Sequence, residues 1–217
     1  MADIINKSGS ANYIAGHKIF LLDKLNDETC AELIGNISNM VDNIKWQHQY
    51  DTISTQINNP YKINATPQII DVFINSPGGS VNFMNSIMAL LTIARAKNAI
   101  IRTNVIGNAC SCASMIAVQG TPGFRIMYEQ SYHLIHYGSS KYTVNKPTEI
   151  DSATRYEKEM RENLNAIYMN NTGLTKSDLA KFQKTEYNYI PAMKCLDKNI
   201  CDWVLTANGQ FITRRQR

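Results

Sequence analysis

The sequence has no long apolar run and only a few cysteines. No segment approaches the ~18 consecutive apolar residues of a membrane-spanning helix, and the opening MADIINKSGSANYIAG carries acidic and amide residues where a secretory signal needs an apolar stretch. The five cysteines are odd in number and none is spaced Cys-x-x-Cys, so neither a disulfide framework nor a zinc site is indicated. We therefore expect a cytoplasmic protein with reduced thiols, no metal, no other cofactor and no membrane contact.

A strong excess of charge of one sign is also missing. The chain has 22 lysines and arginines against 18 aspartates and glutamates, and Arg214, Arg215 and Arg217 supply part of this net charge of +4. A terminal run of this kind forms a solvated tail, so nucleic acid is not an expected partner. No Gly-Lys-Ser/Thr follows the glycine turn at 77–79, which argues against a phosphate-binding loop there.

From residue 17 onward, apolar runs of strand length alternate with longer amphipathic stretches. This pattern is typical of an α/β domain whose helices pack on a sheet. A polar interval at about 47–67 has neither helical nor strand periodicity and is interpreted as a surface loop or insertion. The predicted organisation is a flexible N-terminal segment at 1–16, one domain at 17–206 and a basic tail at 207–217. Strands are predicted at 18–22, 69–75, 99–107, 124–128, 132–136 and 203–206.

Polar residues before the amphipathic stretches indicate where helices begin. Asn26 and Ser80 are predicted to cap the first two helices, and Thr148 and Asp151 a later, longer one. Thr175 and Asp178 are spaced as a further capping box. The long helix is predicted to bury Ile150, Ala153, Met160, Leu164 and Ile167.

Two turns that follow buried strands hold the candidate functional residues, because α/β folds bind ligands at the carboxyl ends of their strands. The first turn is SPGGS at 76–80, where glycines allow backbone amides to approach an anion. In the second turn, Ser111 begins a helix between Cys110 and Cys112. From the residues alone, Ser111 is either a helix cap or a nucleophile. His136, at a strand end, is either structural or the base of that nucleophile.

Three motifs together resemble a known family. INSPGGS at 74–80, IGNACSCASMIAVQG at 106–120 and LIHYG at 134–138 are similar to the glycine turn, nucleophile segment and histidine segment of the Clp protease proteolytic subunits, the ClpP family. Their order and spacing also match, and the similarity extends from about Lys18 to Thr206 outside the polar interval. The resemblance implies an α/β, ClpP/crotonase-like fold of repeated β-β-α units with helices packed on the sheet.

The same resemblance implies a serine endopeptidase. Ser111 becomes the nucleophile, His136 its general base, and the backbone amides of Gly79 and Cys112 the oxyanion hole. Family members form two stacked heptameric rings, a homo-oligomeric tetradecamer, whose chamber receives unfolded proteins from an ATP-dependent AAA+ unfoldase. The segment 142–144 and the long helix from Thr148 are expected to supply the ring contacts.

The third triad position departs from the family pattern. Where the family has an aspartate, this chain has KTEYNYIPA at 184–192. Counting forward from the preceding motif places Glu186 at that position, whereas counting backward from the C-terminal motif places Tyr187 there. We favour Glu186, because a carboxylate can orient His136 and stabilise its cation. Asn188 is the alternative, and a solvated surface glutamate is the competing interpretation of Glu186.

Other functions stay open at this point. A crotonase-type enzyme would use the same two amides to stabilise acyl-thioester enolates, but its chemistry does not require Ser111 and His136. A catalytically weakened ring subunit is compatible with the missing aspartate, and a phage-head maturation protease would share the chemistry but not the unfoldase. Ser114 or a cysteine is the alternative nucleophile. His133, three residues before His136, is expected to face the opposite side of its strand.

Overall fold

The computed structural model describes residues 4–5, 10–44, 67–136, 138, 146–182, 184 and 188–214. The predicted polar interval, except for its last residue, lies outside the described residues. The segment 142–144 and Glu186 also lie outside them.

The described strands form one mixed sheet in the order β1-β2-β3-β4-β5-β6-β9-β10, with β7 paired to β5 and β8 paired to β7. Strands β3, β4, β5, β6 and β9 run parallel. The long strand β5 pairs with β6 near its middle and with β7 near its end. The bounds are β1 Ile4–Ile5, β2 Tyr13–Ala15, β3 Lys18–Leu21, β4 Ile69–Ser76, β5 Ile100–Cys110, β6 Arg125–Tyr128, β7 Tyr132–Leu134, β8 Tyr189–Pro191, β9 Trp203–Leu205 and β10 Phe211–Ile212.

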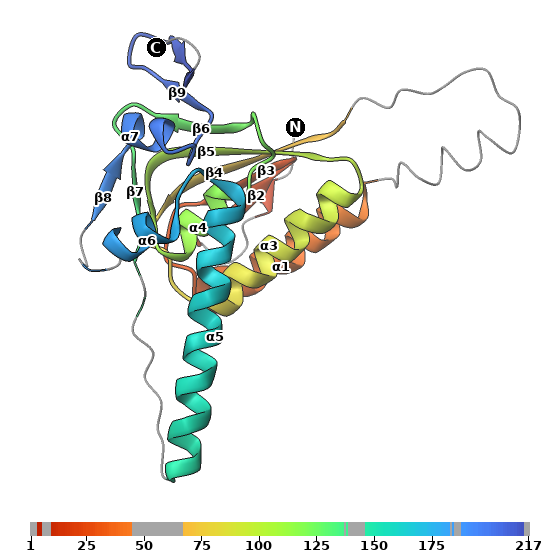
Figure 1. Ribbon diagram of the computed structural model, residues 1–217. Coiled ribbons are helices and arrows are strands. Elements are labelled where there is room, and N and C mark those ends of the chain that lie inside the picture. The colour runs from red at the N-terminus through yellow and green to blue at the C-terminus, as the bar shows by residue number, and fades with distance from the viewer. Residues whose placement is uncertain are drawn as a thin grey trace, which may run out of the picture.

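Helices connect the parallel strands and pack on the sheet, which confirms the predicted α/β class. In Figure 1, α1 and α3 lie side by side beneath the strands. Helix α4 contacts both α3 and α5. Within the described residues, none of these helices is both long enough and apolar enough to cross a bilayer. The bounds are α1 Asp27–Asp42, α3 Val81–Ala96, α4 Cys112–Val118, α5 Pro147–Asn171, α6 Lys176–Phe182 and α7 Ala192–Asp197.

The two faces of the sheet differ in character. On β4, Ile70, Val72 and Ile74 are fully buried and belong to the main hydrophobic core, together with Ile87 and Leu91 of α3. Alternate residues of a strand point to opposite faces, so the residues between them form the second face. There the rings of Tyr13, Phe20 and Phe73 stack across three neighbouring strands at centroid distances of 4.6 and 5.1 Å.

Two predicted helix starts are confirmed by capping boxes. The Asn26 side chain accepts the Thr29 backbone N–H at 3.0 Å, and the Thr29 hydroxyl oxygen accepts the Asn26 N–H at 3.3 Å. The hydroxyl oxygen of Thr175 accepts the Asp178 N–H at 3.1 Å, and the Asp178 carboxylate accepts the Thr175 N–H at 3.0 Å. These short-range patterns therefore identify helix starts correctly.

Of the two other predicted caps, one is in the predicted position without a side-chain bond and one is wrong. Ser80 occupies the N-cap position of α3, but its side chain makes no capping hydrogen bond. Helix α5 begins at Pro147 with Lys146 as its N-cap, so Thr148 and Asp151 lie inside the helix. A proline at the first helical position has no N–H to cap and a backbone angle already suited to a helix, which explains the earlier start.

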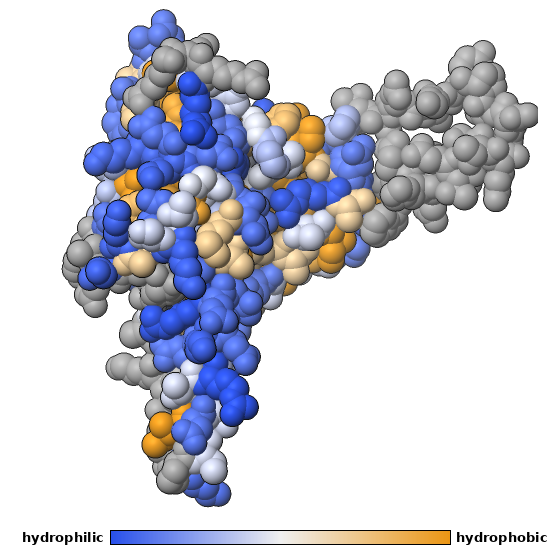
Figure 2. Space-filling model, viewed as in Figure 1, coloured by the Kyte–Doolittle hydropathy of each residue, from blue (hydrophilic) through white to orange (hydrophobic). Residues whose placement is uncertain are grey.

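The long helix α5 extends away from the body of the protein at its N-terminal end (Figure 1). The prediction that Ile150 is buried is wrong, because 52% of this residue is exposed. Figure 2 shows hydrophobic surface near this free end of the helix. Leu164 and Tyr168, further along α5, are buried against the body.

The sheet also reaches beyond the predicted domain limits of 17–206. Strand β2 pairs antiparallel with β3, with Ile14 opposite Ile19. Strand β10 pairs with β9, with Ile212 opposite Val204. Because these pairings use backbone groups, side-chain patterns alone did not indicate them.

Candidate active site

Ser111 lies in a sharp turn between the end of β5 and the start of α4. Its backbone has φ +54° and ψ −123°, a conformation that residues other than glycine rarely adopt and that costs on the order of 1–3 kcal/mol. The Ser111 N–H donates to the Leu134 carbonyl of β7 at 2.8 Å, which holds the turn in place. Such a strained strand-to-helix turn is also how serine hydrolases of another fold present their nucleophile.

The Ser111 side chain is not a helix cap. The Ser111 side chain forms no capping hydrogen bond. Ser111 is half-buried, whereas every residue of α4, from Cys112 to Val118, is buried. Ser111 therefore occupies the N-cap position of α4 without capping the helix through its side chain. Its hydroxyl is left for a neighbouring group or a ligand.

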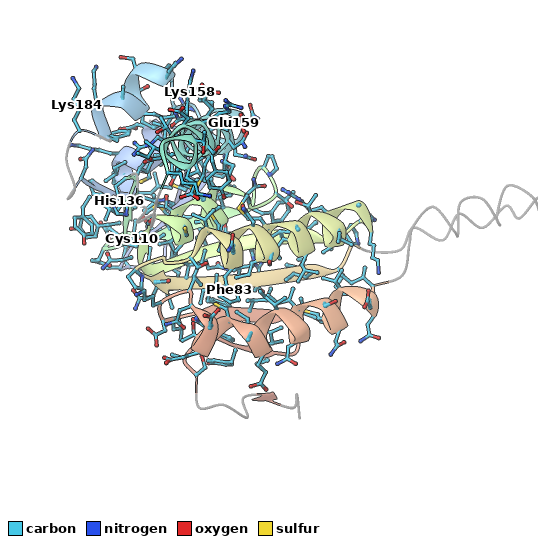
Figure 3. The ribbon with its side chains drawn as sticks, turned by 90° about the horizontal axis from the view of Figure 1, so that it is seen from below. Phe83, Cys110, His136, Lys158, Glu159 and Lys184 are labelled. Carbon is cyan, nitrogen blue, oxygen red and sulfur yellow. The ribbon has the colours of Figure 1, made fainter. Side chains whose placement is uncertain are left out.

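His136 comes to the same end of the sheet as Ser111. Strand β7 runs parallel to β5, with Leu134 opposite Cys110, and His136 follows two residues later. Figure 3 shows the labelled side chains of Cys110 and His136 at the same edge of the molecule. His136 is half-buried, so a substrate that contacts Ser111 could also reach its ring. The strand pairing thus places at the same end of the sheet two residues that are 25 positions apart in the sequence.

The glycine turn packs directly against Ser111. A Cβ atom on Gly78 would lie 2.4 Å from the Cys110 carbonyl oxygen and 2.9 Å from the Ser111 Cβ. Gly78 and Gly79 also have φ of +85° and +145°, which favour glycine. Leu25 holds the turn from the other side: its N–H donates to the Gly78 carbonyl, and its carbonyl accepts the Ser80 N–H, both at 2.8 Å. Only glycine permits this close approach of the two turns.

Cys112 connects the two turns through its thiol. The Cys112 Sγ–H donates to the Gly79 carbonyl at 3.1 Å. Burial raises the pKa of Cys112, although hydrogen bonds from the Gly79 backbone and the Ser111 side chain oppose that rise. Burial also raises the pKa of Cys110. Since the thiolate is the nucleophilic form of cysteine, these two residues are poor nucleophiles at neutral pH.

A second serine and histidine pair lies behind the candidate site. The Ser114 Oγ is 2.8 Å from the His133 Nδ1, but Ser114 is 0% exposed and His133 is 1% exposed. A substrate cannot reach this pair. His133 thus points into the core. Ser114 is also excluded as an alternative nucleophile by its burial.

His133 should make the protein less stable in acid. Burial, and next the charge of Arg125, lower the pKa of His133 from 6.5 to about 3, so folding keeps the ring neutral. His133 in the unfolded chain then binds a proton more readily than His133 in the folded protein. The contribution of His133 to stability is therefore fully present above pH 6.5 and is lost progressively as the pH falls toward 3. At pH 5 this loss is about 2 kcal/mol, at about 1.4 kcal/mol per pH unit below 6.5.

Urea unfolding of the wild type and His133→Asn at pH 7 and pH 5 measures this loss. The asparagine amide oxygen can take the place of Nδ1 but does not titrate, so the drop between the two pH values should be about 2 kcal/mol smaller in the variant. Equal drops in the two proteins would contradict the assignment.

Asn188, one of the two candidate third residues, directly precedes β8. Strand β8 runs antiparallel to β7 with Tyr189 opposite Leu134, so Asn188 lies beside the end of β7 from which the chain continues to His136. Asn188 is half-buried. Glu186 lies outside the described residues, so its role stays a prediction.

Tyr168 was not identified from the sequence. Its hydroxyl donates to the Ser114 Oγ at 3.1 Å, and the residue is 1% exposed. Its spacing of four residues from Leu164 placed it on the apolar face of the long helix, but nothing in the sequence indicated a hydrogen-bond partner. Within the described part of the chain, no group of three His, Cys, Asp or Glu residues is arranged to hold a metal ion.

Comparison with known proteins gives two kinds of match. A family model described as Clp protease matches residues 37–208, a range that includes Gly79, Ser111, His136 and Glu186. An ATP-dependent Clp protease proteolytic subunit of Mesostigma viride is 28% identical over 140 residues, which cover 62% of this chain and 56% of that protein. A protein of the same name from Chlorokybus atmophyticus is 34% identical over 107 residues, covering 46% of this chain and 43% of that protein. The chain therefore spans about half the length of the curated relatives it matches.

Proposed function

Because the chain belongs to the Clp protease family, we propose that it is a serine peptidase subunit whose nucleophile is Ser111 and whose general base is His136. The observation that carries this proposal is the strained turn at Ser111, whose N–H donates to the Leu134 carbonyl two residues before His136. Strain of this kind persists only where the surrounding structure holds it, and it clusters at active sites. The turn supports a functional role for the serine hydroxyl.

The reaction is that of a serine protease. The Ser111 Oγ attacks the scissile carbonyl while His136 takes the proton of the hydroxyl. His136 then returns this proton to the leaving amine. The amides of Gly79 and Cys112 then stabilise the negative oxygen of the tetrahedral intermediate. The close packing of Gly78 on Ser111 supports this assignment, since it brings the glycine turn to the nucleophile. Water subsequently releases the acyl group by the same route.

Glu186 orients His136 in this proposal, with Asn188 as the alternative. The pairing of β8 with β7 supports a contribution from this region of the chain, because it places Asn188 beside the end of β7 that leads to His136. A carboxylate would stabilise the imidazolium ion that forms when Ser111 is deprotonated, whereas an amide could only orient the ring.

The substrates are unfolded proteins, cleaved inside a chamber formed by copies of this chain. The matched relatives are named as ATP-dependent proteolytic subunits, and this chain has no Gly-Lys-Ser/Thr loop of its own. A separate AAA+ unfoldase would supply the ATP-driven step. Five unpaired, buried cysteines are compatible with a reducing, cytoplasm-like compartment.

Labelling with a fluorophosphonate tests the proposed function, because only an activated serine reacts with it. We expect one modified peptide, containing Ser111, and loss of peptide hydrolysis in proportion to labelling. Hydrolysis without labelling at Ser111 would contradict the assigned nucleophile. A chain that neither hydrolyses peptides nor reacts would favour the catalytically weakened ring subunit, and turnover of acyl thioesters would favour a crotonase-type enzyme.

The active species should be a ring particle and not a monomer. The N-terminal end of α5 extends from the body and exposes Ile150 and Tyr156, which are 52% and 56% exposed. Exposed apolar residues on a projecting helix support a contact between subunits. In a sedimentation experiment with activity measured across the fractions, peptide hydrolysis should coincide with a particle of the size of two heptameric rings. A fully active monomer would contradict this prediction.

A further inference from the structure

Three buried polar side chains form a hydrogen-bonded chain behind the candidate active site. The Tyr168 hydroxyl donates to the Ser114 Oγ at 3.1 Å, and the Ser114 Oγ lies 2.8 Å from the His133 Nδ1. Exposure is at most 1% for each of the three residues. They come from three different elements: Tyr168 from α5, Ser114 from α4 and His133 from β7. We call this set the Tyr168–Ser114–His133 chain.

The hydrogen bonds of this chain have a direction. Since the Ser114 oxygen accepts the Tyr168 proton, its own proton is free to be donated to the His133 Nδ1. Nδ1 can accept only when the ring is neutral, and the burial of His133 favours the neutral form. Each bond therefore satisfies a polar group that would otherwise be buried without a partner, which is costly in a protein interior.

The Tyr168–Ser114–His133 chain attaches to the helix that follows Ser111 and to the strand that precedes His136. Ser114 lies on α4, three residues or about one turn after Ser111. His133 lies on β7, which ends at Leu134, and His136 follows two residues after that end. The backbone bond from Ser111 N–H to the Leu134 carbonyl is a second attachment between the same two elements. Together, the backbone and side-chain bonds restrict the movement of β7 relative to α4.

We propose that the Tyr168–Ser114–His133 chain positions the general base against the nucleophile, with Tyr168 and Ser114 acting as positioning residues for catalysis. This inference rests on the proposed function of Ser111 and His136. The Tyr168–Ser114–His133 chain touches neither the substrate nor the reacting atoms. It acts by fixing the separation of α4 and β7, and thereby the distance between Ser111 and His136. Small displacements of reacting groups change turnover strongly.

Tyr168→Phe, Ser114→Ala and the double variant test this proposal on assembled particles. Tyr168→Phe removes one hydroxyl and keeps the buried ring. We expect kcat on a short peptide to fall about tenfold in each single variant with KM unchanged, and the fluorophosphonate labelling rate to fall by the same factor. The double variant should be no slower than the slower single variant, because either change breaks the same chain. Tyr128→Phe, which removes a hydroxyl from a 36% exposed residue on β6, is the matched control and should keep wild-type kcat.

Amide hydrogen exchange supplies a readout that does not depend on activity. Breaking the chain should raise exchange in the peptides covering 111–118 and 132–136, while exchange in α1 and α3 stays as in the wild type. Unchanged exchange in both peptides, or faster exchange with unchanged kcat, overturns the proposal. If the wild-type protein shows neither hydrolysis nor labelling, the proposed function is wrong, and so is a catalytic role for the Tyr168–Ser114–His133 chain. The exchange result then still decides whether the Tyr168–Ser114–His133 chain holds α4 to β7.

Discussion

Ser111→Ala is expected to lower peptide hydrolysis by at least about a thousandfold while leaving the particle assembled. In the proposed mechanism the hydroxyl attacks the carbonyl, so its removal should leave only the contribution of the oxyanion hole and substrate binding. Alanine is slightly smaller than serine and makes the same backbone bonds, including the N–H to the Leu134 carbonyl. The fold and its assembly should therefore be retained. Turnover of a fluorogenic peptide by the purified particle measures the effect.

Ser86→Ala is the matched control for this variant. Ser86 is also half-buried, and it lies on α3, where its hydroxyl donates to the Asn82 carbonyl of the same helix. Its loss should leave hydrolysis at the wild-type level. If the Ser111→Ala particle, free of contaminating protease, hydrolyses the peptide near the wild-type rate, Ser111 is not the nucleophile. Ser114 and the five cysteines are all buried, so a substrate would then have to be attacked from a site not described above.

Glu186→Gln is the second change with a large expected effect, a fall in kcat of about a hundredfold to ten-thousandfold. Glutamine keeps the size of the side chain and its capacity to accept a hydrogen bond, but it removes the negative charge. In the proposed mechanism, the imidazolium ion of His136 would then form without a compensating charge when Ser111 is deprotonated. Little loss of stability is expected. Single-turnover acylation of Ser111, monitored together with urea unfolding, separates the two effects.

Asn188→Ala is the comparison variant for Glu186→Gln. If Glu186 orients His136, the loss of the Asn188 amide should change kcat by less than about tenfold. The reverse order, a small effect of Glu186→Gln and a large effect of Asn188→Ala, would assign the orienting role to Asn188. Small effects of both changes together with low wild-type turnover would favour a weakened subunit.

Local patterns predicted much of the architecture. The apolar runs at 69–75 and 99–107 predict strands, because consecutive apolar residues of that length indicate buried strands. The structure has β4 at Ile69–Ser76 and β5 at Ile100–Cys110. The capping boxes at Asn26 and Thr175 were also identified from residue spacing. These features depend on residues within three or four positions of one another, so the sequence contains all that is needed to predict them.

Helix α5 shows where a local pattern is insufficient. Its apolar spacing placed Ile150 and Leu164 on the same face, yet only Leu164 is buried. Periodicity indicates which residues of a helix share a face, but not whether another element covers that face along its whole length. Only the tertiary arrangement decides how far the helix extends beyond the body.

For the candidate site, the sequence by itself determined which residues are chemically suitable: a serine at the start of a helix, a histidine at a strand end and a pair of glycines in a turn. The tertiary structure decided the backbone conformation of Ser111, the packing of Gly78 against it and the pairing of β5 with β7 that directs His136 to the same edge. It also separated the accessible Ser111 from the buried Ser114, which binds His133. The physical reason is that burial and strand pairing depend on contacts between residues far apart in the chain, and no local pattern encodes them.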